Sequence, residues 1–172
     1  MSTGSPASPA GTPPLAGKAK RARRVLLSAA AALAVADLAV KGLAVLTLQH
    51  GAGADLGIIN LRLLYNTGVA FSLGAGLAPW LVIAATATII LTMTWYAVST
   101  APAMSRLSRA GAALVLGGAA GNLVDRLDGR GVVDYLHTGW FPTFNLADAF
   151  VTIGAGLYVL GTLRHSRANT PD

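Results

Sequence analysis

Cysteine and glutamate are both absent from this chain of 172 residues, and charged residues are scarce, at 12% of the total. Without cysteine, thiol catalysis, disulfide bonds and cysteine-based metal sites are excluded. The sequence also lacks the H-E-x-x-H motif of zinc proteases and the G-x-S-x-G motif of serine hydrolases. A G-x-G-D motif, which would indicate another class of intramembrane aspartic protease, is missing too. All seven acidic residues are aspartate.

What the chain has in abundance is long apolar stretches, four of which, joined by short polar connections, make up most of it. The second stretch has 22 residues without a charge, enough for a helix to cross roughly 30 Å of hydrocarbon. This composition is typical of membrane proteins. We therefore predict a mainly α membrane protein, a four-transmembrane-helix bundle forming a single domain over residues 25–165. The predicted helices span about residues 25–48, 77–98, 110–129 and 144–163.

The basic residues are distributed unevenly along the chain, whose formal net charge is +6. Nine of the thirteen precede the first predicted helix, separate the second from the third, or follow the fourth: Lys18, Lys20, Arg21, Arg23, Arg24, Arg106, Arg109, Arg164 and Arg167. Because cytoplasmic loops carry an excess of lysine and arginine, both termini are predicted to be cytoplasmic and the loops at 49–76 and 130–143 extracytoplasmic. The charge therefore indicates contact with membrane lipids and not with nucleic acid.

Tails flank the predicted domain on both sides. Residues 1–24 are predicted to be a disordered basic cytoplasmic tail, and residues 166–172 form a second cytoplasmic tail. A cleaved secretory signal ending at Ala34-Val35-Ala36 is an alternative. We prefer an uncleaved anchor, because cleavage there would separate the apolar stretch from Asp37 and Lys41. These two residues are spaced i, i+4 on one helix face, and we predict a salt bridge between them.

Two further segments carry local structural signals. In the first outer loop, residues 57–65 and 69–73 alternate weakly between apolar and polar, which predicts short strands in a small β-rich region. Asn66 and Gly68 lie between them in "YNTGVAF", which indicates a turn. In the third helix, "LGGAAGNLVDRL" (116–127) is rich in small residues, which predicts close helix packing.

Three aspartates are predicted to lie at one depth in the membrane. If the third helix enters near Ala110, Asp125 lies about 22 Å further along it, near the outer edge of the hydrocarbon. If the fourth helix enters from outside near Phe144, Asp148 lies about 6 Å inside that same edge. Asp134 belongs to the connection between these helices. A carboxylate within a membrane costs a few kcal/mol, so such residues usually face a protein interior or a water-filled cavity.

Each of these acids also has a purely structural interpretation. Asp148 can be the third residue of a helix capped by Asn145, where the helix dipole favours an acid. Asp125 can pair with Arg126 at the end of its helix, and Asp134 can be a solvated loop residue. Three independent coincidences in one layer are harder to accept than any one of them, so the cluster favours a functional site.

Paired carboxylates suit hydrolysis. Two of them close together cannot easily both ionise, so one keeps its proton and the site holds a general base and a general acid. Such a pair can activate water against an amide carbonyl. Alternatives remain at this point: a small membrane protein that translocates protons or cations through the same aspartates, or a scaffold whose polar residues only join helices. Asp134 with His137 is too small a ligand set to indicate a metal site.

Five motifs, in order along the chain, resemble those of the lipoprotein signal peptidases, also called signal peptidase II or prolipoprotein signal peptidases (aspartic peptidase family A8). They are "DLAVK" (37–41), "YNTGVAFS" (65–72), "GGAAGNLVDRL" (117–127), "GVVDYLH" (131–137) and "FNLADAF" (144–150). One such motif would be weak, but five in order on four predicted helices are specific. Only the tails and the second helix fall outside the match.

The resemblance implies an aspartic endopeptidase of the bacterial inner membrane, with its active site on the extracytoplasmic side. Such an enzyme cuts the signal peptide from a prolipoprotein just before the cysteine that carries a diacylglyceryl group. The motifs assign the catalytic pair to Asp134 and Asp148, with Asp125, Asp37 and Lys41 in supporting roles. Other matching positions would shape the site or contact substrate: Asn66, Gly68, Asn122, Arg126, Asn145 and Ala147. The family also implies a monomer that needs no cofactor or metal and is inhibited by globomycin-type peptides.

The chain departs from the family pattern in two places. Tyr135 stands where phenylalanine is more usual, and only 13 residues separate Asp134 from Asp148, a short interval. The connection between them contains Trp140 and Phe141, which are candidates for gripping the substrate, although Trp140 can equally be an interfacial anchor.

Overall fold

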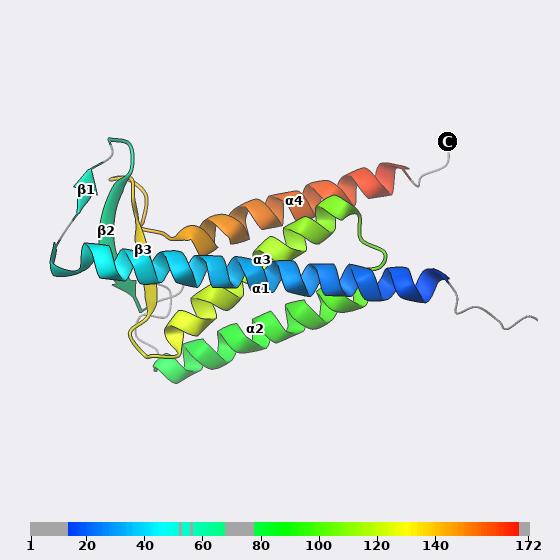
Figure 1. Cartoon of the computed structure of the whole chain (residues 1–172), viewed down its shortest axis with the longest axis horizontal. Coiled ribbons are helices and arrows are strands. Elements are labelled where there is room, and N and C mark those ends of the chain that lie inside the picture. The colour runs from blue at the N-terminus through cyan, green and yellow to red at the C-terminus, as the bar shows by residue number, and fades with distance from the viewer. Residues whose placement is uncertain (1–13, 52, 56, 68–77, 169–172) are drawn as a thin grey trace, which may run out of the picture.

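Four helices dominate the computed structural model, which describes residues 14–51, 53–55, 57–67 and 78–168 (Figure 1). They are α1 (Pro14–Leu48), α2 (Pro79–Thr100), α3 (Arg106–Arg126) and α4 (Leu146–Ala168). All four are long and apolar enough to cross a membrane, which confirms the predicted set of four spanning helices. The remaining elements are a 3-10 turn, η1 (Gln49–Gly51), and three strands, β1 (Ala54–Asp55), β2 (Asn60–Asn66) and β3 (Val132–His137).

The first helix begins much earlier than the sequence analysis predicted. α1 starts at Pro14 and not at residue 25, so residues 14–24 of the predicted disordered tail are helical. Proline is well tolerated at the first position of a helix, and the alanine, lysine and arginine that follow have high helix propensity. Low hydrophobicity was therefore a poor guide to disorder in this segment. Residues 1–13 and 169–172 of the predicted tails lie outside the described part of the chain.

The bounds of the other helices follow their capping residues. α3 begins at Arg106 because the Ser105 side chain accepts a hydrogen bond from the Ser108 amide at 3.0 Å, a cap that the hydropathy pattern missed. It ends at Arg126, three residues before the predicted end, and Gly129 and Gly131 with positive φ follow. α2 begins with Pro79, within two residues of its predicted start.

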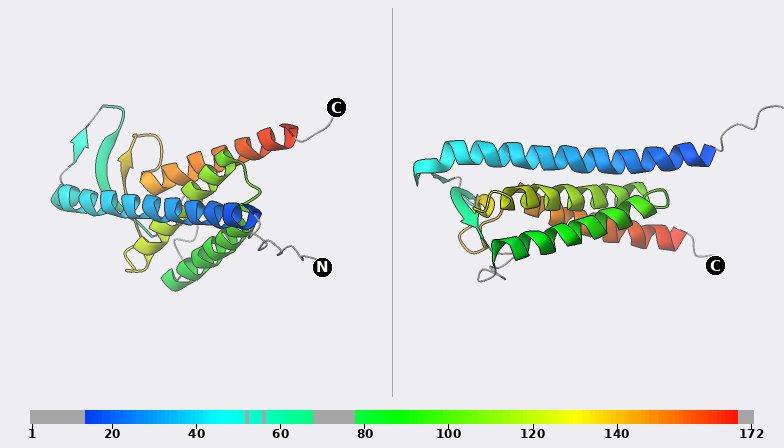
Figure 2. Two further views of the ribbon diagram at one scale, coloured as in Figure 1. Left: turned by 45° about the vertical axis from the view of Figure 1, so that its right-hand side comes forward. Right: turned by 90° about the horizontal axis from the view of Figure 1, so that it is seen from below.

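α3 is the central helix and contacts each of the other three. Seen from below, α1 lies along one side of α3 while α2 and α4 lie on the other (Figure 2). Glycines permit the close approaches that the small-residue motif predicted. A Cβ at Gly117 would lie 2.8 Å from the Ala30 carbonyl oxygen of α1, and one at Gly118 would collide with the Ala147 carbonyl oxygen of α4. Larger residues at these two positions would separate the helices.

The three strands form an antiparallel sheet in the order β1-β2-β3 at one end of the bundle. β2 confirms the strand predicted over residues 57–65, whereas the strand predicted at 69–73 and the turn at Gly68 lie outside the described residues. β3 was not predicted as a strand. It pairs with β2 so that Leu64 faces Asp134 and Asn66 faces Val132. The sheet packs on the end of α1 through a cluster of Ala44, Leu48, Val133 and Tyr135.

Candidate active site

The first turn of α4 holds Asp148 by reciprocal hydrogen bonds. The Asn145 side-chain oxygen accepts from the Asp148 amide at 3.0 Å, and the Asp148 carboxylate accepts from the Asn145 amide at 3.2 Å. This is the arrangement of a capping box, and it confirms the predicted cap at Asn145. The structural interpretation therefore accounts for one carboxylate oxygen of Asp148. It leaves the other carboxylate oxygen of Asp148 available to a second partner.

Asp134 lies in β3 and is almost fully buried, with 1% of its surface exposed. The alternative interpretation of Asp134 as a solvated loop residue is wrong, because β3 pairs with β2 and contacts α1 and α3. Each of its carboxylate oxygens accepts one side-chain amide: Asn145 donates to Oδ1 at 2.7 Å, and Asn66 donates to Oδ2 at 3.1 Å. Burial, and then the charge of Asp148, raise the pKa of Asp134 to about 6, and the two amide hydrogen bonds oppose that rise.

Asparagine side chains join the two carboxyl groups into one network. Asn122 of α3 donates to Asp148 Oδ1 at 2.9 Å and accepts from Asn145 Nδ2 at 3.2 Å. The same Asn145 nitrogen contacts Asp134, so a single amide links the environments of both acids. The structure therefore brings together two acids and three asparagines that the sequence had singled out: Asp134, Asp148, Asn66, Asn122 and Asn145.

A buried lysine of α1 contacts this hydrogen-bond network through its ammonium group. Lys41 of α1 has 2% of its side chain exposed and pairs with Asp37 and Asp125, each at 2.8 Å. The first pair confirms the predicted i, i+4 salt bridge. Lys41 also donates to the Asn122 side-chain oxygen at 2.7 Å, and Asp125 accepts from the Val133 amide at 3.1 Å. The ammonium group thus joins α1 to α3, and Asp125 links both helices to β3.

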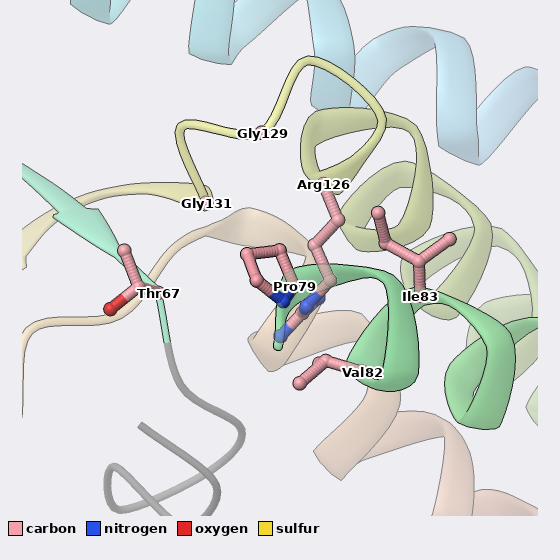
Figure 3. Close-up of a pocket in the computed structure, with 7 residues that line it drawn as sticks. All are labelled: Thr67, Pro79, Val82, Ile83, Arg126, Gly129 and Gly131. Atoms are coloured by element: carbon pink, nitrogen blue, oxygen red, sulfur yellow. The ribbon is translucent and has the colours of Figure 1, made fainter. Parts of the chain in front are cut away.

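Arg126 extends from the end of α3 into a small cavity of about 40 Å³ (Figure 3). Its side chain points toward Pro79 and Val82 at the start of α2, with Thr67 and Gly131 on the other side. Its guanidinium also donates to the Asn122 carbonyl oxygen at 2.9 Å. Because Asn122 also donates to Asp148, this hydrogen bond links the Arg126 cation to the carboxyl network. Gly68, which the sequence analysis grouped with Asn66 in the first outer loop, lies outside the described residues.

The connection that follows β3 carries a row of aromatic rings. Trp140, which is 84% exposed, makes an edge contact with Phe141, and Phe141 makes another with Phe144 just before α4. His137 lies beside Thr143, with 3.2 Å between its Nδ1 and the hydroxyl oxygen. Among the described residues, no three histidine, aspartate or glutamate side chains come together in a group that could hold a metal ion.

Among the contacts that sequence reasoning missed, one involves Tyr135. The Tyr135 hydroxyl accepts a hydrogen bond from the Leu146 amide at 3.2 Å, at the first residue of α4. The sequence marked Tyr135 only as a departure from a family pattern. No local signal could have paired it with Leu146, because the contact depends on how β3 meets α4.

Taken together, this geometry defines a class: a multi-pass membrane protein with one buried and one half-buried carboxyl group in a shared network at one end of its bundle. A buried carboxyl that keeps its proton up to about pH 6, beside a second carboxylate, can serve as general acid and general base. The family model described as signal peptidase (SPase) II matches residues 29–164.

Relatives agree with that match. The lipoprotein signal peptidase of Rhodococcus jostii is 38% identical over 159 residues, covering 82% of this chain and 74% of that protein. That of Mycobacterium avium is 35% identical over 172 residues, covering 90% and 87%. A bacterial membrane enzyme solved at 2.3 Å by the in meso method has the same fold, with a TM-score of 0.73 at 22% identity over 86% of this chain and 93% of that one. The chain belongs to the signal peptidase II family.

Proposed function

We propose that this protein is an aspartic endopeptidase that removes signal peptides from diacylglyceryl-modified prolipoproteins, cutting just before the lipidated cysteine. Membership of the signal peptidase II family and relatives named lipoprotein signal peptidase support the substrate class. The observation that carries the mechanism is the shared hydrogen-bond network of Asp134 and Asp148 through Asn145.

In the proposed mechanism, Asp134 holds the proton of the pair, consistent with its burial and with its pKa of about 6. Asp148 takes a proton from water as the water oxygen bonds to the scissile carbonyl carbon, and Asp134 gives its proton to the carbonyl oxygen. The resulting diol collapses as the C–N bond breaks. Asp148 then protonates the leaving nitrogen, and a diol hydroxyl returns a proton to Asp134, which restores the starting state.

The remaining residues have proposed roles around this chemistry. Asn66, Asn122 and Asn145 orient the two carboxyl groups, while Asp37, Lys41 and Asp125 support them from the helices. Arg126 and the aromatic connection at Trp140 and Phe141 contact the substrate. Family motifs and contacts with the carboxyl network support the roles of the asparagines, the lysine and the helix aspartates. The role of the aromatic connection is proposed from its position between the two catalytic acids in the chain.

The site is proposed to face the extracytoplasmic side of the bacterial inner membrane. β3, the end of α3 and the start of α4 lie at one end of the bundle (Figure 1), and the arginine-rich helix ends lie at the other. The positive-inside rule then puts the carboxyl pair at the outer edge, the depth at which a lipidated cysteine is anchored. We propose a monomer without a cofactor that is inhibited by globomycin-type peptides.

Cleavage of a lipidated prolipoprotein by the purified protein in detergent, with EDTA present, tests the proposal. Asp134→Asn and Asp148→Asn should each abolish product while the protein remains folded. Asp55→Asn is a matched control, because Asp55 is an exposed carboxylate whose Oδ1 accepts from the Gly57 amide, and it should cleave at the wild-type rate. Near-normal turnover by either site variant would refute the paired-carboxyl assignment, and loss of cleavage with EDTA alone would refute the metal-free mechanism.

Translocation of protons or cations is not favoured. A relay of protons or cations across the membrane needs polar groups at successive depths through its thickness. Between Asp55 and Asp125, and again between Asp148 and Asp172, the chain has no acidic residue. The acids therefore gather at one end of the helices and do not form a path between the two sides.

A further inference from the structure

All the amide groups at the start of α4 have hydrogen-bond acceptors. The first amides of a helix have no partner within the helix and must find one elsewhere. Asn145 and Asp148 satisfy each other, whereas the two amides between them depend on other elements. The Ala147 amide donates to Asp37 of α1 at 2.9 Å, and the Leu146 amide donates to the Tyr135 hydroxyl of β3 at 3.2 Å.

Tyr135 lies in β3, directly after Asp134, at the start of the chain segment that separates the two acids. Its ring is 6% exposed and packs in the apolar cluster with Ala44 and Val133. Its backbone amide also donates to the Phe144 carbonyl oxygen at 3.1 Å, and Leu136 makes two further backbone hydrogen bonds with Phe144. Tyr135, which directly follows Asp134 in the chain, thus holds Phe144 with its backbone and Leu146, the first residue of α4, with its side chain.

We propose that the hydroxyl of Tyr135 is a positioning residue for Asp148: by accepting the Leu146 amide, it holds the first turn of α4 in place relative to Asp134. This inference rests on the proposed roles of the two aspartates. The hydroxyl suits the task because burial raises the pKa of Tyr135 to about 12, so it stays neutral in any assay near neutrality. Phenylalanine would fill the same space but leave the amide without an acceptor.

The decisive comparison is Tyr135→Phe against Tyr65→Phe. Tyr65 lies on the neighbouring strand, faces Val133 in the register and contacts the same apolar cluster, so the control removes the same atom nearby. With a lipidated peptide substrate, Tyr135→Phe should lower kcat about two- to tenfold, the value of one hydrogen bond, with KM unchanged. The limb of its pH profile near 6 should move to higher pH. A displaced Asn145 donates a weaker hydrogen bond to the Asp134 carboxylate, and this raises the pKa of Asp134. Tyr65→Phe should change neither.

Amide hydrogen exchange of the wild-type protein supplies a test that does not depend on any variant folding. The Leu146 amide should be protected, and Tyr135→Phe should accelerate its exchange. A wild-type kcat and an unmoved pH limb in Tyr135→Phe would overturn the proposal, as would equal losses in Tyr65→Phe or an unprotected Leu146 amide in the wild type. Activity in Asp148→Asn would instead refute the proposed function, even with Leu146 still protected.

Discussion

At the scale of single residues, the two acids of the site are chemically alike but differently placed. Asp134 is buried in a strand between two amide donors, whereas Asp148 lies half-buried in the first turn of a helix. Environment, and not residue type, separates their proposed roles, as in enzymes that use paired carboxyl groups. The protons belong to the pair, so titrations report apparent values for both together.

The pH dependence of cleavage should reveal this difference. Because Asp134 must be protonated to act as the acid, kcat/KM should fall as the pH rises through about 6. Removing the charge of Asp148 removes one cause of the raised pKa, so the pKa of Asp134 in Asp148→Asn should be lower. The limb is measured from kcat/KM between pH 4 and 9, and the titration by carbon NMR of labelled aspartate. An increase of kcat/KM through pH 6 would contradict the assignment of the acid.

Gly131 should affect the cleavage rate as strongly as a polar residue of the site, because it keeps Asn66 in place. Its φ is +97°, and a Cβ there would lie 2.5 Å from the Asn66 carbonyl oxygen, whose residue donates to Asp134. Gly131→Ala should therefore lower the cleavage rate roughly ten- to hundredfold by displacing Asn66. Gly129→Ala is the control, since its φ of +77° carries a similar strain but its Cβ would meet open space. Equal rates for the two variants would show that backbone strain alone matters.

At the scale of elements, ionic contacts and glycines both fix how the helices meet. Lys41 connects α1 to α3, Asp37 connects α1 to α4, and Asn122 connects α3 to the first turn of α4. Gly121 makes room for the Asp37 carboxylate against α3. The site is thus assembled from three helices and two strands, and no single element contains it.

Lys41→Met should destabilise the protein by about 3–5 kcal/mol, because it leaves Asp37 and Asp125 buried without their cation. Lys18→Met, at an exposed position of the same helix, should have little effect. Thermal unfolding in detergent measures both. A Lys41→Met protein as stable as Lys18→Met would mean that the ammonium group does not support the bundle.

Close packing of α3 on α4 can be tested at two glycines of one helix. A Cβ at Gly154 would lie 2.7 Å from the Gly111 carbonyl oxygen, whereas one at Gly156 meets nothing within 4 Å. Gly154→Ala should destabilise the fold by about 1–3 kcal/mol through overpacking. Gly156→Ala should stabilise it by up to about 1 kcal/mol, since alanine favours the helix. The same sign of change at both positions would contradict this packing.

At the scale of the whole molecule, the carboxyl network and the basic helix ends lie at opposite ends of the bundle. By the positive-inside rule, this polarity predicts the orientation of the protein in the membrane. The exposed Trp140 belongs to the connection between β3 and α4, the two elements that carry the acids.

The orientation can be measured directly because the chain has no cysteine of its own. Trp140→Cys should react with a membrane-impermeant maleimide in intact cells whose outer envelope has been opened. Arg106→Cys, at the opposite end, should react only after the inner membrane is disrupted. Labelling of Arg106→Cys in intact cells would reverse the proposed orientation.

The sequence by itself determined the four spanning helices, the cap at Asn145, the Asp37–Lys41 pair and the family. These features depend on length, hydropathy or neighbours three to four residues apart, which are local and visible in one chain. Local rules also misled at residues 14–24, where composition suggested disorder but helix propensity prevailed.

Only the tertiary structure decided which groups meet at the site. It buried Asp134 in an unpredicted strand, connected Asp125 to Lys41, and supplied Tyr135 and Asp37 as acceptors for the first amides of α4. These contacts join residues 11 to 110 positions apart. Hydropathy gives each helix a depth but no rotation or partner, so the pairing of polar groups follows from how the helices and strands pack, and from the cost of leaving any buried polar group unpaired.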